Sequence, residues 1–189
     1  MRKIGILGGT FDPPHIGHLI IAEEVRLALE LEEVWFIPTY TPPHKDSTKT
    51  SVNDRIEMTK LAIASNPYFK INTIEIERSG KSYTIDTIRE FKKNHTDCEF
   101  YFIIGADMVE YLPNWQEIDA LVKLVQFVGV KRSSYELNTP YDILTVDIPL
   151  IDVSSSMVRS WLGKNRTAKY IVPEAVHSYI EGEKLYGTK

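Results

Sequence analysis

The sequence predicts an α/β fold with a doubly wound, mostly parallel sheet, helices on both faces and a small C-terminal helical part. Three observations predict it. Short apolar runs of strand length alternate with segments of helical period through most of the chain. The first apolar run breaks at two glycines and two prolines directly before a helical pattern, which is typical of a strand, a loop and a helix. The length of 189 residues, with 43% hydrophobic residues, suits a single domain over residues 1–189.

Local patterns define the elements expected in the first half of the chain. An apolar run from Ile4 to Leu7 predicts the first strand, and a stripe of apolar residues from Leu19 to Leu29 predicts the helix after it. Ser51 and Asp54 have the spacing of a capping box and predict the start of a second helix. The other expected elements are strands over 34–37 and 69–76, a helix over 84–94, and a long loop over 38–50.

The second half continues the alternation and ends in a more helical part. Asn114 and Glu117 have the spacing of a helix cap and predict the start of another helix. Its apolar residues form a stripe that continues to Val125. Repeated strand and helix units imply right-handed crossovers, a Rossmann-like sheet and a ligand cleft at the carboxyl ends of its strands. The other expected elements are strands over 99–104 and 126–130, a polar stretch over 131–139, two short strand-like pieces within 141–151, and helices over 154–162 and 173–181.

Composition argues against several classes of partner. The formal net charge of −4 disfavours a nucleic-acid partner, which requires a basic face. Cys98 is the only cysteine, so no intramolecular disulfide can form; a reducing compartment and a packing role for the thiol are expected. No apolar run approaches the ~18 residues of a membrane span, and the first residues lack a signal pattern. We therefore expect a cytoplasmic protein without membrane contact.

The first loop has the properties of a phosphate site. Gly8 and Gly9 let the backbone turn sharply and approach an anion, and the next helix directs unpaired N–H groups to the same place. His15 and His18 are three residues apart, so both imidazoles lie on one face at the helix start and can donate to phosphoryl oxygens. A metal site with His44 and a purely structural role are the alternatives. The metal site lacks an adjacent glutamate and a completing Cys or carboxylate cluster.

Two further groups of residues could bind a ligand. Hydroxyl groups over 154–156 at a helix start, with Arg159 one turn later, could form a second anion site; the alternative is an ordinary N-cap and a solvated arginine. After the strand over 99–104, Trp115 could stack on a flat ring with Tyr111 beside it, and Asp107 could accept from a ribose hydroxyl. Trp115 also fits a helical core stripe, so its spacing leaves both roles open.

Two stretches carry a family resemblance. The run Gly-Gly-Thr-Phe-Asp-Pro-x-His-x-Gly-His over 8–18 resembles the signature of the HxGH nucleotidyltransferase superfamily. Residues 153–159 are similar to its second signature, Ile-Ser-Ser-Thr-x-x-Arg, with Val153 in place of isoleucine and Ser156 in place of threonine. The resemblance implies that His15, His18 and Arg159 are catalytic. The ATP-binding residues that it implies are Gly8, Gly9, Thr10, Phe11, His15, His18, Lys131, Arg132, Ser155, Ser156 and Arg159.

Over nearly its whole length the chain is similar to the nicotinate-nucleotide branch of that superfamily. The run from Gly105 to Trp115 and the tripeptide Ser82-Tyr83-Thr84 resemble its nicotinate-recognising segments. By this resemblance Trp115 stacks on the pyridine ring and Thr84 receives its carboxylate. The acceptor-binding residues implied are Lys45, Thr84, Asp107, Tyr111 and Trp115. From the residues alone, Thr84 could instead be a plain helix N-cap and Lys45 a solvated loop side chain.

The resemblance implies adenylyl transfer from ATP to nicotinic acid mononucleotide, giving nicotinic acid adenine dinucleotide (deamido-NAD) and pyrophosphate in NAD biosynthesis. Mg²⁺ is expected on the ATP phosphates, without a metal site in the protein. The alternatives are a related enzyme acting on nicotinamide mononucleotide or phosphopantetheine, and a non-catalytic ATP-binding sensor. A fragment of an aminoacyl-tRNA synthetase is disfavoured because a Lys-Met-Ser-Lys-Ser loop is absent. A homo-oligomer, and the preference between acid and amide, stay open.

Overall fold

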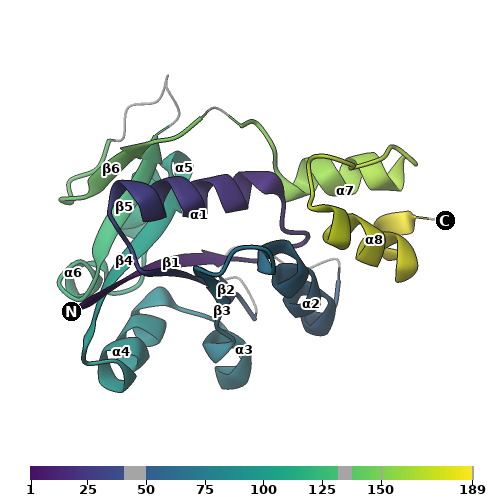
Figure 1. Cartoon of the computed structure of the whole chain (residues 1–189). Helices are drawn as coiled ribbons and strands as arrows, with labels where there is room; N and C mark the ends of the chain where they lie inside the picture. The colour runs from purple at the N-terminus through teal and green to yellow at the C-terminus, as the bar shows by residue number, and fades with distance from the viewer. Residues whose placement is uncertain (41–49, 132–137, 150, 189) are drawn as a thin grey trace.

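A computed structural model describes residues 1–40, 50–131, 138–149 and 151–188. Within them a six-stranded sheet has the order β3-β2-β1-β4-β5-β6, and every neighbouring pair is parallel (Figure 1). The strands are β1 Arg2–Gly9, β2 Glu33–Pro38, β3 Phe69–Ile71, β4 Cys98–Gly105, β5 Gln126–Lys131 and β6 Leu144–Asp147. The predicted α/β class is confirmed, and the described strands are all parallel.

Helices cover both faces of the sheet, with α1 on one face and α4 on the other (Figure 1). The helices are α1 Ile16–Ala28, α2 Val52–Ile63, α3 Ile74–Arg78, α4 Thr84–Asn94, α5 Ala106–Tyr111, α6 Ile118–Leu121, α7 Ser155–Gly163 and α8 Glu174–Gly182, with 3₁₀ turns η1 Leu112–Asn114 and η2 Leu185–Gly187. Ile4 and Ile6 of β1 pack with α4, whereas Leu7 packs with α1. Because both faces are buried, these strands read as continuous apolar runs. None of the helices in the described residues is both long and apolar enough to cross a membrane.

Capping signals located most helix starts correctly. Ser51 caps α2, because its Oγ accepts from the backbone N–H of Asp54 at 3.1 Å. Ser154 caps α7 in the same way, accepting from the N–H of Met157 at 3.2 Å. Pro173 occupies the N-cap position of α8, one residue before the first helical residue. These three predicted helix starts are therefore confirmed to within a residue.

The strand predicted over 69–76 is wrong in its second half. The strand ends at Ile71, and residues 74–78 form the short helix α3. The alternation of Ile74, Glu75 and Ile76 suggested a strand, yet Glu75 is the buried residue of this helix. A carboxyl group therefore lies where the period-two pattern placed a solvent-facing side chain.

The predictions that follow β4 also need correction. The helix expected from 115 to 125 is reduced to the four residues of α6, because η1 precedes it and Glu117 has a left-handed φ of 51°. The helix α5, directly after β4, was not predicted. Between residues 141 and 151, β6 is one strand where two short pieces were expected.

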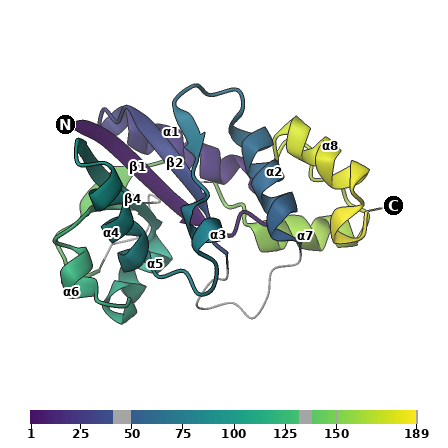
Figure 2. The same ribbon diagram turned by 90° about the horizontal axis from the view of Figure 1, so that it is seen from below.

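The helix α8 packs against α2 at one end of the molecule (Figure 2). The hydroxyl of Tyr179 on α8 donates to Asp54 Oδ1 on α2 at 2.9 Å. Apolar residues of α2, α7 and α8 belong to the same core as those of α1. The C-terminal part is thereby brought next to the loop that follows β1.

The order of the strands reverses between β1 and β4. From β1 the chain continues to β2 on one side, and from β4 it continues to β5 on the other. In open α/β sheets ligands bind in the crevice at such a reversal, outside the carboxyl ends of the strands. Residues 10–15 follow β1 and residues 106–115 follow β4, so both predicted substrate segments lie at this crevice.

Candidate active site

The two histidines of the first signature stand at the start of α1. His15 is the N-cap residue, with extended φ and ψ of −141° and 169°, and His18 occupies the third helical position. Their rings stack with centroids 3.8 Å apart. The backbone N–H of His15 donates to Nδ1 of His18 at 3.1 Å. Since Nδ1 accepts this bond, the proton of a neutral His18 imidazole lies on Nε2, which is then a hydrogen-bond donor.

The glycine between the histidines is required by the packing of His15. A Cβ atom at Gly17 would lie 3.0 Å from Nδ1 and 3.1 Å from Cε1 of the His15 ring. The side chain of His15 is only 6% exposed, so its ring lies against the backbone of the helix at this position. The spacing His-x-Gly-His therefore has a steric reason in this chain.

The main chain at the start of α1 contributes less to an anion site than its helix dipole suggests. The N–H of Ile16 donates to the carbonyl of Ile171 at 3.0 Å, and the N–H of His18 donates to the carbonyl of His15 at 3.0 Å. These two groups were among the unpaired donors expected to meet a phosphate. An anion at this helix start would therefore depend more on the imidazoles than the sequence indicated.

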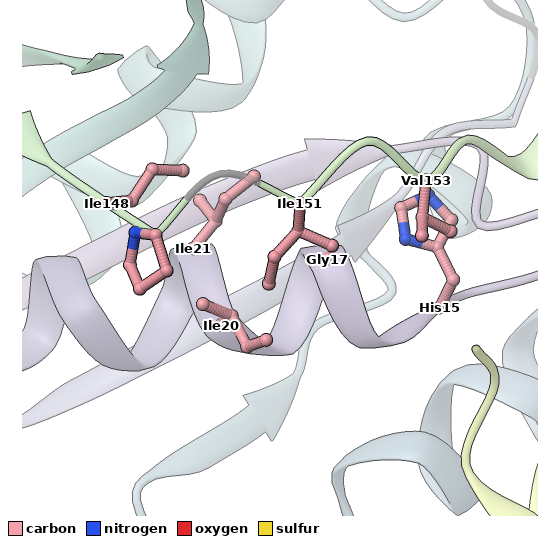
Figure 3. Close-up of a pocket in the computed structure, with 8 residues that line it drawn as sticks. His15, Gly17, Ile20, Ile21, Ile148, Ile151 and Val153 are labelled. Carbon is pink, nitrogen blue, oxygen red and sulfur yellow. The ribbon is translucent and has the colours of Figure 1, made fainter. Parts of the chain in front are cut away.

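A small cavity adjoins His15 on the side of α1 that faces Ile148, Ile151 and Val153 (Figure 3). Figure 3 shows Val153 beside the His15 ring and Ile151 beside Gly17. The cavity has about 20 Å³ of space, which holds about one water molecule. Its described lining residues are His15, Gly17, Ile20, Ile21, Ile148, Pro149, Ile151 and Val153. It is too small for a nucleotide, so a bound ring would have to lie outside it or widen it.

Phe11 is buried beside the His18 ring. Its side chain is 1% exposed, packs edge-on against the His18 ring at 5.1 Å between centroids and contacts Phe36 at 5.7 Å. Its backbone has a positive φ of 49°. A Cβ atom at Gly9 would lie 3.1 Å from the same ring. Phe11 therefore supports His18 from the core, and its contact with ATP stays a prediction.

The second signature reaches back to the first. The Ser155 hydroxyl donates to the Pro13 carbonyl at 2.8 Å, although the two residues are 142 positions apart. Arg159 Nη1 donates to the Asp12 carbonyl at 2.7 Å, and Nη2 donates to Ser156 Oγ at 3.1 Å. The two predicted anion sites thus form one region, in which Arg159 is held in place by protein oxygens.

The predicted acceptor residues lie after β4 and at the start of α4. Asp107 and Tyr111 are exposed on α5, and a Cβ atom at Gly105 would lie 2.8 Å from Asp107 Oδ1, so this glycine makes room for the carboxylate. Thr84 is the first residue of α4, whose N-cap is Tyr83. The interpretation of Thr84 as the N-cap is therefore wrong.

Trp115 takes part in the core, and its stacking on a ligand ring stays a prediction. The indole is partly buried and packs edge-on against Phe102 and Phe127, with centroids 5.7 and 5.8 Å away. Its Nε1 is buried and has no hydrogen-bond partner among the described residues. Both contacts are edge-on, and the indole keeps a partly exposed surface at the crevice.

Several predicted residues cannot be placed. Lys45, His44 and Arg132 lie outside the described residues. Lys131 is the last residue of β5 and is partly exposed, and its carbonyl accepts from the N–H of Ile148 at 3.2 Å. Among the residues that the structure describes, no three His, Cys, Asp or Glu side chains are grouped so as to hold a metal ion.

Sequence reasoning missed a buried carboxyl group behind the Ser82-Tyr83-Thr84 segment. Glu75 is 8% exposed and accepts from the Thr87 hydroxyl at 2.9 Å, and the same hydroxyl accepts from Arg78 Nη2 at 2.9 Å. Burial raises the pKa of Glu75, against the opposing effects of its hydrogen bond with Thr87 and the charge of Arg78. Glu75 therefore links α3 to the start of α4.

Comparison with known proteins assigns the chain to a family. The cytidylyltransferase-like family matches residues 6–160. A protein of Geobacillus thermodenitrificans named "Probable nicotinate-nucleotide adenylyltransferase" is 55% identical over 190 residues, covering 100% of this chain and 88% of that protein. A protein of the same name from Bacillus licheniformis is 52% identical over the full length of both chains.

A solved structure gives the same result for the fold. The Plasmodium falciparum nicotinic acid mononucleotide adenylyltransferase complexed with NaAD superposes with a TM-score of 0.84 at 22% identity, covering 100% of this chain and 99% of that chain. At this identity the likeness concerns the fold alone, whereas the bacterial relatives match end to end at more than half of the positions. The chain therefore belongs to the cytidylyltransferase-like family and, within it, to the nicotinate-nucleotide adenylyltransferases.

Proposed function

We propose that this chain transfers the adenylyl group of ATP to nicotinic acid mononucleotide, giving nicotinic acid adenine dinucleotide and pyrophosphate in NAD biosynthesis. One observation carries the proposal. The paired imidazoles at the start of α1 and the Ser155–Arg159 turn of α7 form one region, joined by hydrogen bonds to Pro13 and Asp12. This region supplies hydrogen-bond donors and a cation at the carboxyl end of β1, the edge at which open α/β sheets bind ligands.

The chemistry needs no general base from the protein. The phosphate of the mononucleotide has a second pKa of about 6 and is ionised near neutral pH. One of its oxygens attacks the α-phosphorus of ATP in line and forms a new P–O bond. The bond from the α-phosphorus to the bridging oxygen breaks, and pyrophosphate leaves with that electron pair. Alignment and charge stabilisation then account for the rate.

His18 is the donor whose geometry is best defined. Its Nδ1 is occupied by the His15 N–H, so Nε2–H is the group that would donate to the α-phosphate as negative charge builds. His15 stacks beside it and would donate to the same phosphate or to the bridging oxygen. Arg159, with Ser155 and Ser156, would hold the departing pyrophosphate.

The remaining ATP contacts belong to the same proposal. Gly8, Gly9 and Thr10 would approach the phosphates through their main chain, as would Phe11, whose ring is buried. Lys131 at the end of β5, with Arg132 after it, would border the adenine and the triphosphate. The strand β5 lies next to β4 in the sheet, on the far side of β4 from β1.

The acceptor would lie on the β4 side of the crevice. Trp115 would stack its exposed face on the pyridine ring while its edge stays against Phe102 and Phe127. Thr84 and neighbouring amides would receive the carboxylate, Asp107 and Tyr111 would flank the ribose and the ring, and Lys45 would contact the phosphate. Recognition of the carboxylate by neutral donors suits the start of α4, where the helix dipole favours an anion.

We further propose that ATP is used as its Mg²⁺ complex. The side chains of the described phosphate region that would meet the triphosphate are the two imidazoles and Arg159, whereas the Asp12 carboxylate is buried and bonded within the protein. Such a region suits phosphate oxygens that already carry the ion, which would neutralise charge on the leaving pyrophosphate. We also propose a single catalytic domain over 1–189 and a cytoplasmic location, which a lone, buried cysteine favours.

A pyrophosphate-release assay tests the proposed function. The purified chain is given ATP and Mg²⁺ with nicotinic acid mononucleotide, nicotinamide mononucleotide or phosphopantetheine, and kcat/KM is measured for each acceptor. The proposal predicts release that depends on the acceptor and is fastest with nicotinic acid mononucleotide. Faster release with another acceptor would reassign the substrate. Binding of ATP without release with any of the three would indicate a sensor instead of an enzyme.

A further inference from the structure

A buried carboxyl group lies within the proposed nucleotide loop. Asp12 is 3% exposed, and its Oδ1 accepts from the Thr50 hydroxyl at 2.7 Å and from the Tyr186 hydroxyl at 2.6 Å. Its carbonyl accepts from Arg159 at 2.7 Å. Tyr186 comes from η2, 174 positions further along the chain. The turn between the phosphate loop and the histidines is therefore held from three separate segments.

A buried guanidinium lies under the same loop. Arg55 on α2 is 0% exposed, and its Nη1 donates to the carbonyls of Thr10 and Thr39, both at 2.8 Å. Nη2 donates to the carbonyl of Tyr40 at 3.3 Å. Burial lowers the pKa of Arg55, and the negative charge of Asp12 opposes that effect. Arg55 thus ties the residues after β1 to those after β2.

The charges of Asp12 and Arg55 explain why their contacts would matter for an anionic substrate. A carboxylate three residues before His15 would repel a triphosphate unless its charge were balanced within the protein. The Thr50 and Tyr186 hydroxyls donate to its Oδ1, and the positive charge of the buried Arg55 interacts favourably with it. Burial and the neighbouring carboxylate raise the pKa of Tyr186, so its hydroxyl keeps the proton that it donates.

We propose that Tyr186 and Arg55 are positioning residues for ATP: through Asp12 and Thr10 they fix the loop that presents His15 to the α-phosphate. The proposal rests on the proposed function and adds two residues that the signatures do not contain. Neither residue contacts the reacting atoms. When the Tyr186 hydroxyl is missing, the Asp12 carboxylate loses a donor and shifts toward its other donors, and the adjoining main chain shifts with it.

The test compares Tyr186→Phe with Tyr179→Phe. Both tyrosines are in the C-terminal part, and both donate to an aspartate, with Tyr179 reaching Asp54 on α2 at 2.9 Å. Each substitution removes one hydroxyl and keeps the ring. We expect Tyr186→Phe to lower kcat/KM for ATP about tenfold, with KM for the mononucleotide within about twofold of the original. Tyr179→Phe should leave both values unchanged. Arg55→Lys keeps the charge but cannot reproduce the three carbonyl bonds of the guanidinium, so it should also lower kcat/KM for ATP.

The outcomes separate this inference from the proposed function. Equal kcat/KM values for ATP in the two tyrosine variants would overturn the inference. An equal decrease of kcat/KM for ATP and for the mononucleotide in Tyr186→Phe would also overturn it. Melting temperatures show whether a loss of fold explains the result. If the unaltered chain releases no pyrophosphate with any acceptor, the proposed function fails. Equilibrium binding of ATP then decides this inference, because only Tyr186→Phe should weaken it.

Discussion

Replacing Gly17 by alanine tests the steric reason for the HxGH spacing. The new Cβ would lie 3.0 Å from Nδ1 and 3.1 Å from Cε1 of His15, which is several tenths of an ångström closer than ordinary contact. The His15 ring cannot simply turn away, because it is 6% exposed and stacks on His18 at 3.8 Å. We expect both imidazoles to shift by a few tenths of an ångström while the protein stays folded.

The size of the effect follows from the geometry of catalysis. A displacement of ~1 Å at a reacting centre can cost about 10²-fold in rate, so a shift of several tenths should lower kcat about tenfold. Stability should change little, because alanine is about 1 kcal/mol more favourable than glycine within a helix, and this gain offsets part of the strain. Pyrophosphate release measures kcat, and thermal unfolding measures stability.

Gly182→Ala is the matched control for this experiment. Gly182 also lies in a helix, α8, and a Cβ atom there would meet nothing within 4 Å. Its kcat should equal that of the unaltered chain. An unchanged kcat in Gly17→Ala, or the same loss in both variants, would refute the steric argument for this glycine.

Three further predictions concern other parts of the site. His18→Ala should lower kcat by about 10²–10³-fold without unfolding the protein, because it removes one preorganised donor; near-normal kcat would remove His18 from the mechanism. Trp115→Ala should raise KM for the mononucleotide about tenfold or more with little change in KM for ATP, whereas equal changes would assign the indole to the core alone. Glu75 has a pKa raised above its ordinary 4.5, so the folded chain binds more protons there than the unfolded chain, and stability should fall as the pH rises from the ordinary value through the raised one. In urea unfolding, Glu75→Gln should therefore gain stability relative to the original chain as the pH rises above 4.5; a difference that stays constant with pH would show that the pKa of Glu75 is not raised.

Local signals predicted the parts of the fold that depend on neighbouring residues. Glycines and prolines located the loop after β1, and a serine at the N-cap located the starts of α2 and α7. The same reasoning failed over 74–78, where a period-two pattern was too short to exclude a five-residue helix with a buried glutamate. It failed again after Trp115, where the left-handed φ of Glu117 interrupts a stripe that otherwise reads as one helix.

The sequence predicted the residues of the candidate site but not the residues that hold them in place. The signatures pointed to His15, His18 and Arg159, because motif spacing is local information. Asp12 and Tyr186 are 174 positions apart, and no local pattern joins them. Arg55 lies in a helix with little overall hydrophobicity, where a charged residue reads as solvent-facing, yet it is fully buried. Long-range hydrogen bonds to main-chain carbonyls leave no periodic signal in a sequence.

The most direct test of the mechanism is a crystal structure of the chain with a non-hydrolysable ATP analogue. The central claim is that His18 donates through Nε2 to the α-phosphate at the start of α1. We predict that Nε2 lies within about 3.2 Å of an α-phosphate oxygen, with Nδ1 still bonded to the His15 N–H. An α-phosphate bound out of reach of both imidazoles would contradict the claim.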